Sequence, residues 1–198
     1  MKRISFLITA IFAVAAFISF SSVSAKDGLA VGATMENFKL TDTSGAEKSF
    51  NDLKGKNGAI LVFLSVQCPV VKGYDARIVK LAEDYAAKGI NVIGINSNST
   101  EAMEKVKAHA AENYKFPVLI DKGNVLADRL GANVTPEIFY LNEKNVLVYH
   151  GAIDNSRSGD SITDNFLRDA VESNLSGKAV AKTNTNAFGC SIKRAEKN

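Results

Sequence analysis

This chain of 198 residues has few cysteines and a small net charge, and each of these two features excludes a class of protein. Two cysteines are too few for a disulfide-dense scaffold or for a cysteine-rich metal site. A formal charge of +3, without a cluster of lysines and arginines, does not indicate nucleic-acid binding. Aromatic residues make up 8% of the chain and glycine occurs 14 times, which argues against disorder, collagen and a coiled coil. The length fits one domain with its own hydrophobic core.

The first 25 residues have the three parts of a secretory signal peptide. Two basic residues follow Met1, a mostly apolar run covers 4–20, and small residues fill 21–25. An uncleaved membrane anchor is the alternative, but the apolar run is at the short limit for spanning a bilayer. We therefore predict an exported protein, periplasmic or secreted, that is not bound to a membrane after cleavage. An exported location permits a disulfide.

The hydrophobic pattern of the remaining chain predicts an α/β fold. A hairpin is expected over 31–56, and residues 178–198 have no periodicity and are expected to form a C-terminal tail after a domain of residues 26–177. Thr100 is the predicted N-cap of one helix, and Ser161 with Asp164 forms a predicted capping box for another. The predicted strands cover 59–64, 90–95, 118–120, 137–141 and 146–150, and the predicted helices cover 69–85, 100–113, 125–130 and 162–177. This order predicts a mixed central sheet with helices on both faces.

Cys68 lies where a predicted buried strand ends and a predicted helix begins. Pro69 suits the first position of that helix. A thiol at a helix N-terminus lies near exposed N–H groups that favour the thiolate, which is the nucleophilic form. The alternative is a buried, inert cysteine. The position of Cys68 favours a reactive thiol.

Three segments together resemble the thioredoxin-fold redoxins of the alkyl hydroperoxide reductase/thiol-specific antioxidant group. They are Val62 to Pro69, Phe116 to Asp121, and Thr135-Pro136, within a likeness that covers roughly 31–175. The resemblance implies a thioredoxin-like fold with an N-terminal hairpin. It also implies that Pro136 is cis, faces Cys68, and shapes a substrate groove with Thr135; an X-Pro bond is the one kind that adopts cis at low cost.

The surroundings of Cys68 depart from both common settings in that group. Val71 stands where a Cys-x-x-Cys motif has its second cysteine, so exchange within one helical turn is excluded. Ser65 supplies the hydroxyl of the peroxidatic Pro-x-x-x-Thr-x-x-Cys motif, but Leu61 replaces its proline. No arginine lies between 129 and 157, so the arginine partner of that motif is not located.

Cys190 lies in a slightly apolar segment of the polar tail, between Phe188-Gly189 and Ser191-Ile192. It resembles the Gly-Cys-Ser-Ile tail of a group of exported redoxins with a Cys-Pro-x-x active site. The chain between Gly177 and Cys190 can extend to about 43 Å, and a domain of this size has a radius of gyration of about 15 Å. We therefore predict a Cys68–Cys190 disulfide, within one chain or between two subunits.

These observations predict an exported thiol-dependent oxidoreductase with peroxiredoxin-like antioxidant activity. Cys68 attacks a hydroperoxide or a protein disulfide, Cys190 resolves the product, Ser65 orients the thiolate, and an external thiol reductant resets the pair. The alternatives are thiol–disulfide exchange on partner proteins and a non-catalytic binding module with a structural disulfide. No organic cofactor is implied. His109 and His150 raise the question of a copper site, but Lys72 stands where redoxin-fold copper carriers have a second cysteine, so no metal is predicted.

Overall fold

The computed structural model describes residues 28–196, so the predicted signal peptide at 1–25 lies outside the described residues. Seven strands form one mixed sheet, in the order β2-β1-β5-β4-β3-β7-β8. β3, β4 and β5 are parallel to one another, whereas β1, β2, β7 and β8 join through antiparallel pairs. The strands are β1 (Lys39–Asp42), β2 (Glu47–Ser49), β3 (Gly58–Leu64), β4 (Ile90–Asn96), β5 (Val118–Ile120), β7 (Glu137–Asn142) and β8 (Leu147–Gly151). The mixed sheet and the hairpin of β1 and β2 confirm the predicted fold class.

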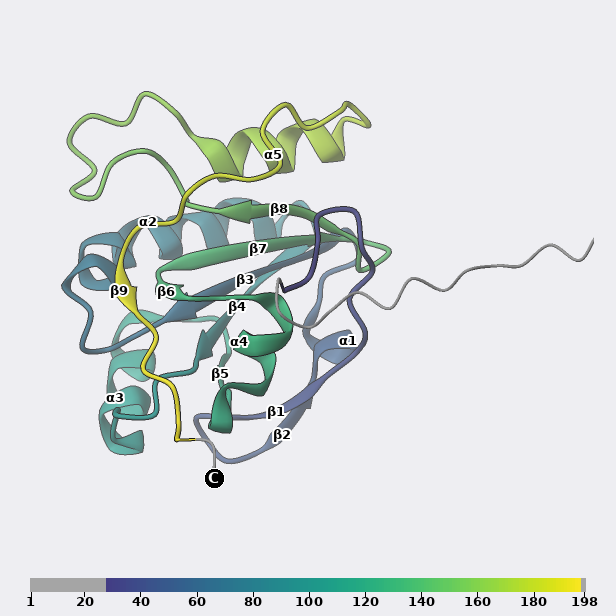
Figure 1. Cartoon of the computed structure of the whole chain (residues 1–198). Helices are drawn as coiled ribbons and strands as arrows, with labels where there is room; N and C mark the ends of the chain where they lie inside the picture. The colour runs from purple at the N-terminus through teal and green to yellow at the C-terminus, as the bar shows by residue number, and fades with distance from the viewer. Residues whose placement is uncertain (1–27, 197–198) are drawn as a thin grey trace, which may run out of the picture.

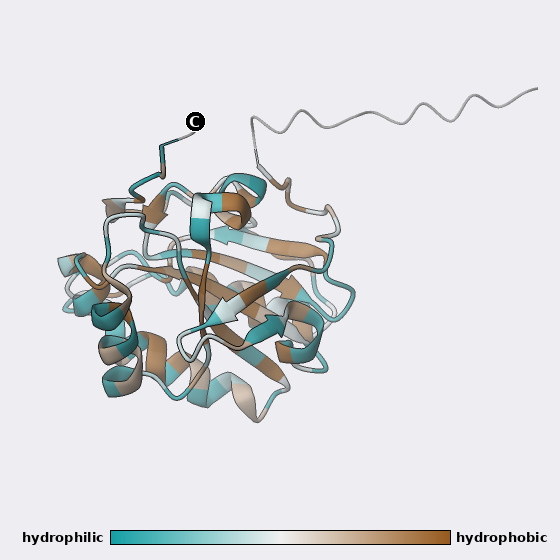
Figure 2. Cartoon of the chain, turned by 90° about the horizontal axis from the view of Figure 1, so that it is seen from below, coloured by the Kyte–Doolittle hydropathy of each residue, from teal (hydrophilic) through white to brown (hydrophobic). Residues whose placement is uncertain are grey.

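β3 lies inside the sheet and is buried at all seven positions, because helices cover both of its faces. Alternate side chains of β3 enter two cores. Ile60 and Val62 belong to the first core, with α2 (Pro69–Ala86), α3 (Met103–Asn113) and α5 (Phe166–Leu175). Leu61 and Phe63 belong to the second core, with α1 (Phe50–Leu53) and α4 (Val125–Leu130). Figure 1 shows α4 in front of the sheet and α2 behind it, and Figure 2 shows hydrophobic residues along the central strands.

Two predicted helix starts are wrong. α3 begins at Met103 with Ala102 as its N-cap, so Thr100 does not cap it; Glu101, which precedes the N-cap, turns its carboxylate toward Ser65. α5 begins at Phe166 with Asn165 as its N-cap, and the predicted capping box before it does not form. There the side chain of Asp164 accepts hydrogen bonds from Asn155 and Lys182. In both cases the N-cap residue makes no side-chain hydrogen bond to the helix, and a nearby acidic side chain binds distant polar groups.

The C-terminal tail is docked along the domain rather than free of it. Thr183 and Thr185 exchange backbone hydrogen bonds with His150 at the end of β8. Further on, β9 (Cys190–Ser191) pairs antiparallel with β6 (Val134–Thr135) in a separate two-stranded sheet. The yellow end of the chain in Figure 1 follows this path. Strands of two residues have no periodic pattern, so neither β6 nor β9 was predicted, nor were the short helices α1 and η1 (Lys122–Asn124).

Candidate active site

Cys68 occupies the N-cap position of α2, and Pro69 is its first helical residue, as predicted. The backbone N–H of Cys68 donates to the carbonyl of Ser65 at 3.3 Å, which closes the short turn between β3 and α2. The side chain of Cys68 is only 1% exposed. The strand and the helix therefore fix the position of the sulfur, and the free N–H groups of the first helical turn lie beside it.

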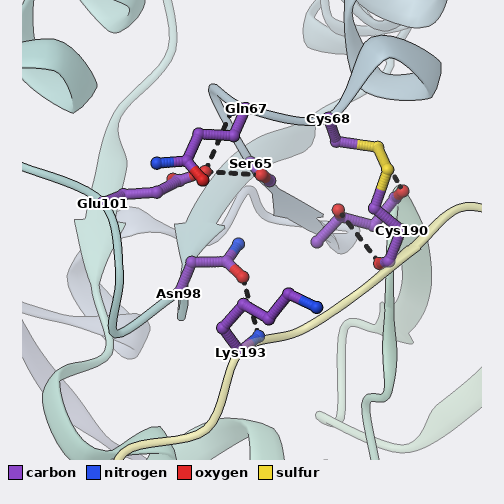
Figure 3. Close-up of a disulfide and its surroundings, with 8 residues drawn as sticks. Ser65, Gln67, Cys68, Asn98, Glu101, Cys190 and Lys193 are labelled. Atoms are coloured by element: carbon purple, nitrogen blue, oxygen red, sulfur yellow. Dashed lines mark hydrogen bonds between the residues drawn. A yellow bond between two sulfur atoms is a disulfide. The ribbon is translucent and has the colours of Figure 1, made fainter.

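Glu101 holds the turn that precedes Cys68. Its Oε1 accepts hydrogen bonds from the Ser65 hydroxyl at 2.5 Å and from the Gln67 N–H at 3.0 Å. Its Oε2 accepts from Nδ2 of Asn96 at 2.6 Å. Figure 3 shows Glu101 and Gln67 on one side of the disulfide, with Ser65 between these two residues and the disulfide. The Ser65 hydroxyl thus faces Glu101, and its predicted role in orienting the thiolate stays a prediction.

The peptide bond between Thr135 and Pro136 is cis, as the resemblance implied. The carbonyl oxygen of Thr135 lies 3.2 Å from Sγ of Cys68. Both Thr135 and Pro136 are buried. This turn therefore forms the wall of the site opposite the N-terminus of α2.

Cys68 and Cys190 form a disulfide within the chain, with their Cα atoms 5.8 Å apart. Within the described residues no cysteine is free. Thr135 pairs with Cys190 in the β6–β9 ladder, so the tail crosses the site as an added strand. Of the two arrangements that the sequence left open, the structure has the intramolecular one.

Glu137 supports the other side of the same strand. Its side chain is buried, and its Oε2 accepts the N–H groups of Asn133 at 2.7 Å and Val134 at 3.0 Å. Its Oε1 lies 2.6 Å from Nε2 of His150, whose ring stacks on Phe139 at 4.2 Å between centroids. The sequence analysis missed both Glu137 and Glu101. A charged residue inside the buried strand β7 was the available signal for Glu137.

Tyr74, Arg77 and Asp154 form a buried cluster on the α2 side of the tail. Arg77 binds Asp154 at 2.6 Å, and its guanidinium lies 3.5 Å from the centre of the Tyr74 ring. Burial and the hydrogen bond that the Tyr74 hydroxyl donates to Asp154 raise the pKa of Tyr74. Phe188 of the tail packs on this cluster, with 6.3 Å between its ring centre and that of Tyr74.

No three His, Cys, Asp or Glu side chains gather as a metal site would within residues 28–196. His109 lies 3.5 Å from Asp75, and His150 contacts Glu137 instead of a cysteine. In the same described range, no helix has the length and apolar character needed to cross a membrane.

A buried cysteine at a helix N-terminus, opposite a cis-proline, defines the chain as a thioredoxin-like redoxin. Its second cysteine comes from a tail strand and not from the helix. Residues 31–150 match the model of the AhpC/TSA family, and the chain belongs to that family. It is a thiol-based oxidoreductase.

Similar proteins agree with this assignment. Thiol-disulfide oxidoreductase ResA of Halalkalibacterium halodurans is 28% identical over 138 residues, which span 69% of this chain and 72% of that protein. Among solved structures, a hypothetical protein of Sinorhizobium meliloti is 33% identical, with a TM-score of 0.78 over 86% of this chain and 97% of its own. An uncharacterized conserved protein of Geobacillus kaustophilus is 30% identical, with a TM-score of 0.80 over 86% and 95%.

Proposed function

We propose that this protein is an exported thiol–disulfide oxidoreductase that acts on disulfides of partner proteins. One observation carries the proposal: the disulfide partner of Cys68 arrives on an extended strand that pairs with β6, directly before cis Pro136. This is the geometry that a mixed disulfide with an extended partner segment requires. The name of the ResA relative supports the same activity. Export rests on the signal-peptide pattern of residues 1–25.

The proposed reaction starts from the reduced protein. The Cys68 thiolate attacks one sulfur of the partner disulfide, and the other partner sulfur leaves as a thiolate and takes up a proton. Cys190 then loses its proton and attacks Sγ of Cys68, which releases the second partner thiol and forms the Cys68–Cys190 disulfide. The partner gains two electrons and this protein loses two. An external thiol reductant returns the pair to the dithiol form.

Two features of the site favour disulfide exchange over peroxide reduction. The Ser65 hydroxyl, the counterpart of a peroxide-binding threonine, donates to Glu101. The carboxylate of Glu101 also places negative charge beside the site, where a peroxidase needs a donor to the developing anion. The predicted peroxiredoxin-like activity, with a hydroperoxide as substrate, stays a prediction. In that reaction Cys68 forms a sulfenic acid, which Cys190 resolves with release of water.

The deciding experiment is a titration of the Cys68–Cys190 pair in glutathione buffers of known potential, with mass detection of the bond. We expect reduction near −200 mV, in the range of working redox proteins. A bond that persists below about −300 mV would support the alternative of a binding module with a structural disulfide. Parallel assays of the reduced protein with a disulfide-bonded protein and with hydrogen peroxide separate exchange from peroxidase activity.

A further inference from the structure

Within residues 28–196, tail residues 188–192 lie across the site, and we call the surface that they cover the groove. The contacts of these residues differ from one position to the next. The first feature is the backbone ladder. Thr135 pairs with Cys190 and Val134 with Ser191, and the N–H of Ile192 donates to the carbonyl of Asn133 at 2.9 Å. An extended segment of any sequence except one with proline at these donors can make such bonds.

The residue before Cys190 has no room for a side chain. A Cβ added to Gly189 would lie 1.9 Å from the carbonyl oxygen of Thr135. That oxygen belongs to the cis-proline turn, which the Glu137 carboxylate and the sheet hold in place. The groove therefore demands glycine directly before the cysteine.

The residues two places before and two places after Cys190 contact different hydrophobic cores. Phe188 packs against the first core, beside Tyr74 and 5.2 Å below the guanidinium of Arg157. Ile192 is 6% exposed and belongs to the second core. Ser191 between them is exposed. The groove thus crosses the end of the sheet and offers one aromatic and one aliphatic subsite.

We propose that the tail is a tethered pseudosubstrate, and that the groove recognises protein partners by an extended aromatic–Gly–Cys–x–aliphatic segment. This inference rests on the proposed function and names its substrate class. Cys68 is 1% exposed beneath the tail, so a partner segment must displace residues 188–192 to reach it. After reduction, only non-covalent contacts hold the tail. The partner and the tail then compete for the same backbone hydrogen bonds with β6.

The test uses the Cys190→Ser protein with thionitrobenzoate attached to Cys68 through a mixed disulfide. A peptide with the sequence of residues 187–193 attacks Sγ of Cys68 through its cysteine thiolate, and thionitrobenzoate leaves and is measured by its absorbance. We expect the peptide to react at least about tenfold faster than glutathione. Alanine in place of the peptide glycine, or of its phenylalanine, should remove about tenfold of that rate or more. Alanine in place of the peptide serine is the matched control and should change nothing.

The outcomes separate this inference from the proposed function. If glutathione and all peptides react at one common rate, Cys68 is a reactive thiol but the groove has no sequence preference, and the inference is wrong. If neither glutathione nor any peptide releases thionitrobenzoate, the proposed function fails together with the inference.

A second measurement follows the tail itself. In the Cys190→Ser protein, iodoacetamide should alkylate Cys68 faster when Ile192→Ala weakens the tail, and at an unchanged rate with Ser191→Ala. A peptide of residues 187–193 with serine in place of its cysteine should slow alkylation of the Ile192→Ala protein again. Equal alkylation rates in both variants, or no protection by the peptide, would show that the tail does not compete for the groove.

Discussion

The two cysteines of the disulfide lie in regions of very different construction. Cys68 is 1% exposed and lies between β3, which is buried at every position, and the 18-residue helix α2. Cys190 is half-buried, in a two-residue strand of a tail with many exposed residues. Segments with few buried contacts open at a lower free-energy cost than the core. The comparison teaches that the core of the domain fixes one sulfur, while a tail segment with fewer buried residues carries the other.

The largest expected effect concerns the chemistry of the two cysteines. Cys68→Ser removes the nucleophile, so reduction of a disulfide-bonded partner should fall to the uncatalysed rate. Cys190→Ser should keep the first attack and accumulate a mixed disulfide between Cys68 and the partner, detected by mass. Full turnover by the Cys190→Ser protein would contradict the division of roles between the two regions.

Breaking the bond should also lower global stability. The disulfide joins residues 122 positions apart, and the chain-entropy model gives a stabilisation of about 5 kcal/mol for a loop of that size. We expect the free energy of unfolding in urea to fall by about this amount between the oxidised and the reduced protein. A difference below about 1 kcal/mol would mean that the crosslink barely restricts the unfolded chain.

The Glu101→Ala variant tests how strongly Glu101 stabilises the turn that precedes Cys68. Glu101→Ala removes the acceptor of the buried Ser65 hydroxyl and leaves Nδ2 of Asn96 with only its longer bond to the Leu64 carbonyl at 3.5 Å. We expect a loss of about 2–3 kcal/mol in the free energy of unfolding. Glu104→Ala, at an exposed position in the first turn of α3, is the control and should cost less than about 0.5 kcal/mol. Equal losses in urea unfolding would contradict the role of Glu101 in holding the turn.

An alkaline titration of the folded protein tests two buried tyrosines, one in contact with the tail and one inside the domain. Burial raises the pKa of both Tyr149 and Tyr140 to about 12, from an ordinary value of 10.0. A raised pKa means that folding favours the neutral phenol, so this stabilisation is complete below about pH 10 and is lost as the pH rises through about 12. Tyrosinate absorbance and unfolding should therefore rise together in that window. Titration of both residues near pH 10 in the folded protein would show that burial does not raise their pKa.

The smallest expected effect is local to the tail. The Tyr149 hydroxyl donates to the carbonyl of Ala152 at 2.6 Å and bonds the Thr185 hydroxyl at 2.5 Å. Tyr149→Phe should cost about 1 kcal/mol and speed amide hydrogen exchange in the tail around residues 183–185. Tyr140→Phe, which loses a bond from Asn174 of α5, is the matched control. In the Tyr140→Phe variant, amide hydrogen exchange should speed up at α5 and not in the tail.

The parts of the site predicted correctly depend on short stretches of sequence. An apolar run before Cys68 predicts the buried strand, and Pro69 predicts the helix start. Glu101 was not predicted as part of the site because its contact with Ser65 spans 36 residues. Glu137 and His150 are 13 residues apart, and the contact depends on the antiparallel register of β7 and β8. The capping predictions at Thr100 and Ser161 failed because both helices begin later, after Ala102 and Asn165, and neither has a side-chain cap.

The sequence by itself determined the order of the central strands and helices, the thiol at the start of α2, and a second cysteine in an apolar part of the tail. Each of these depends on hydrophobic period, on a proline, or on neighbours within a few residues. Only the tertiary structure decided that Cys190 reaches Cys68 within the same chain, on a strand paired with β6. On this path Phe188 packs against one core and Ile192 belongs to the other, and those cores exist only once distant segments have packed together.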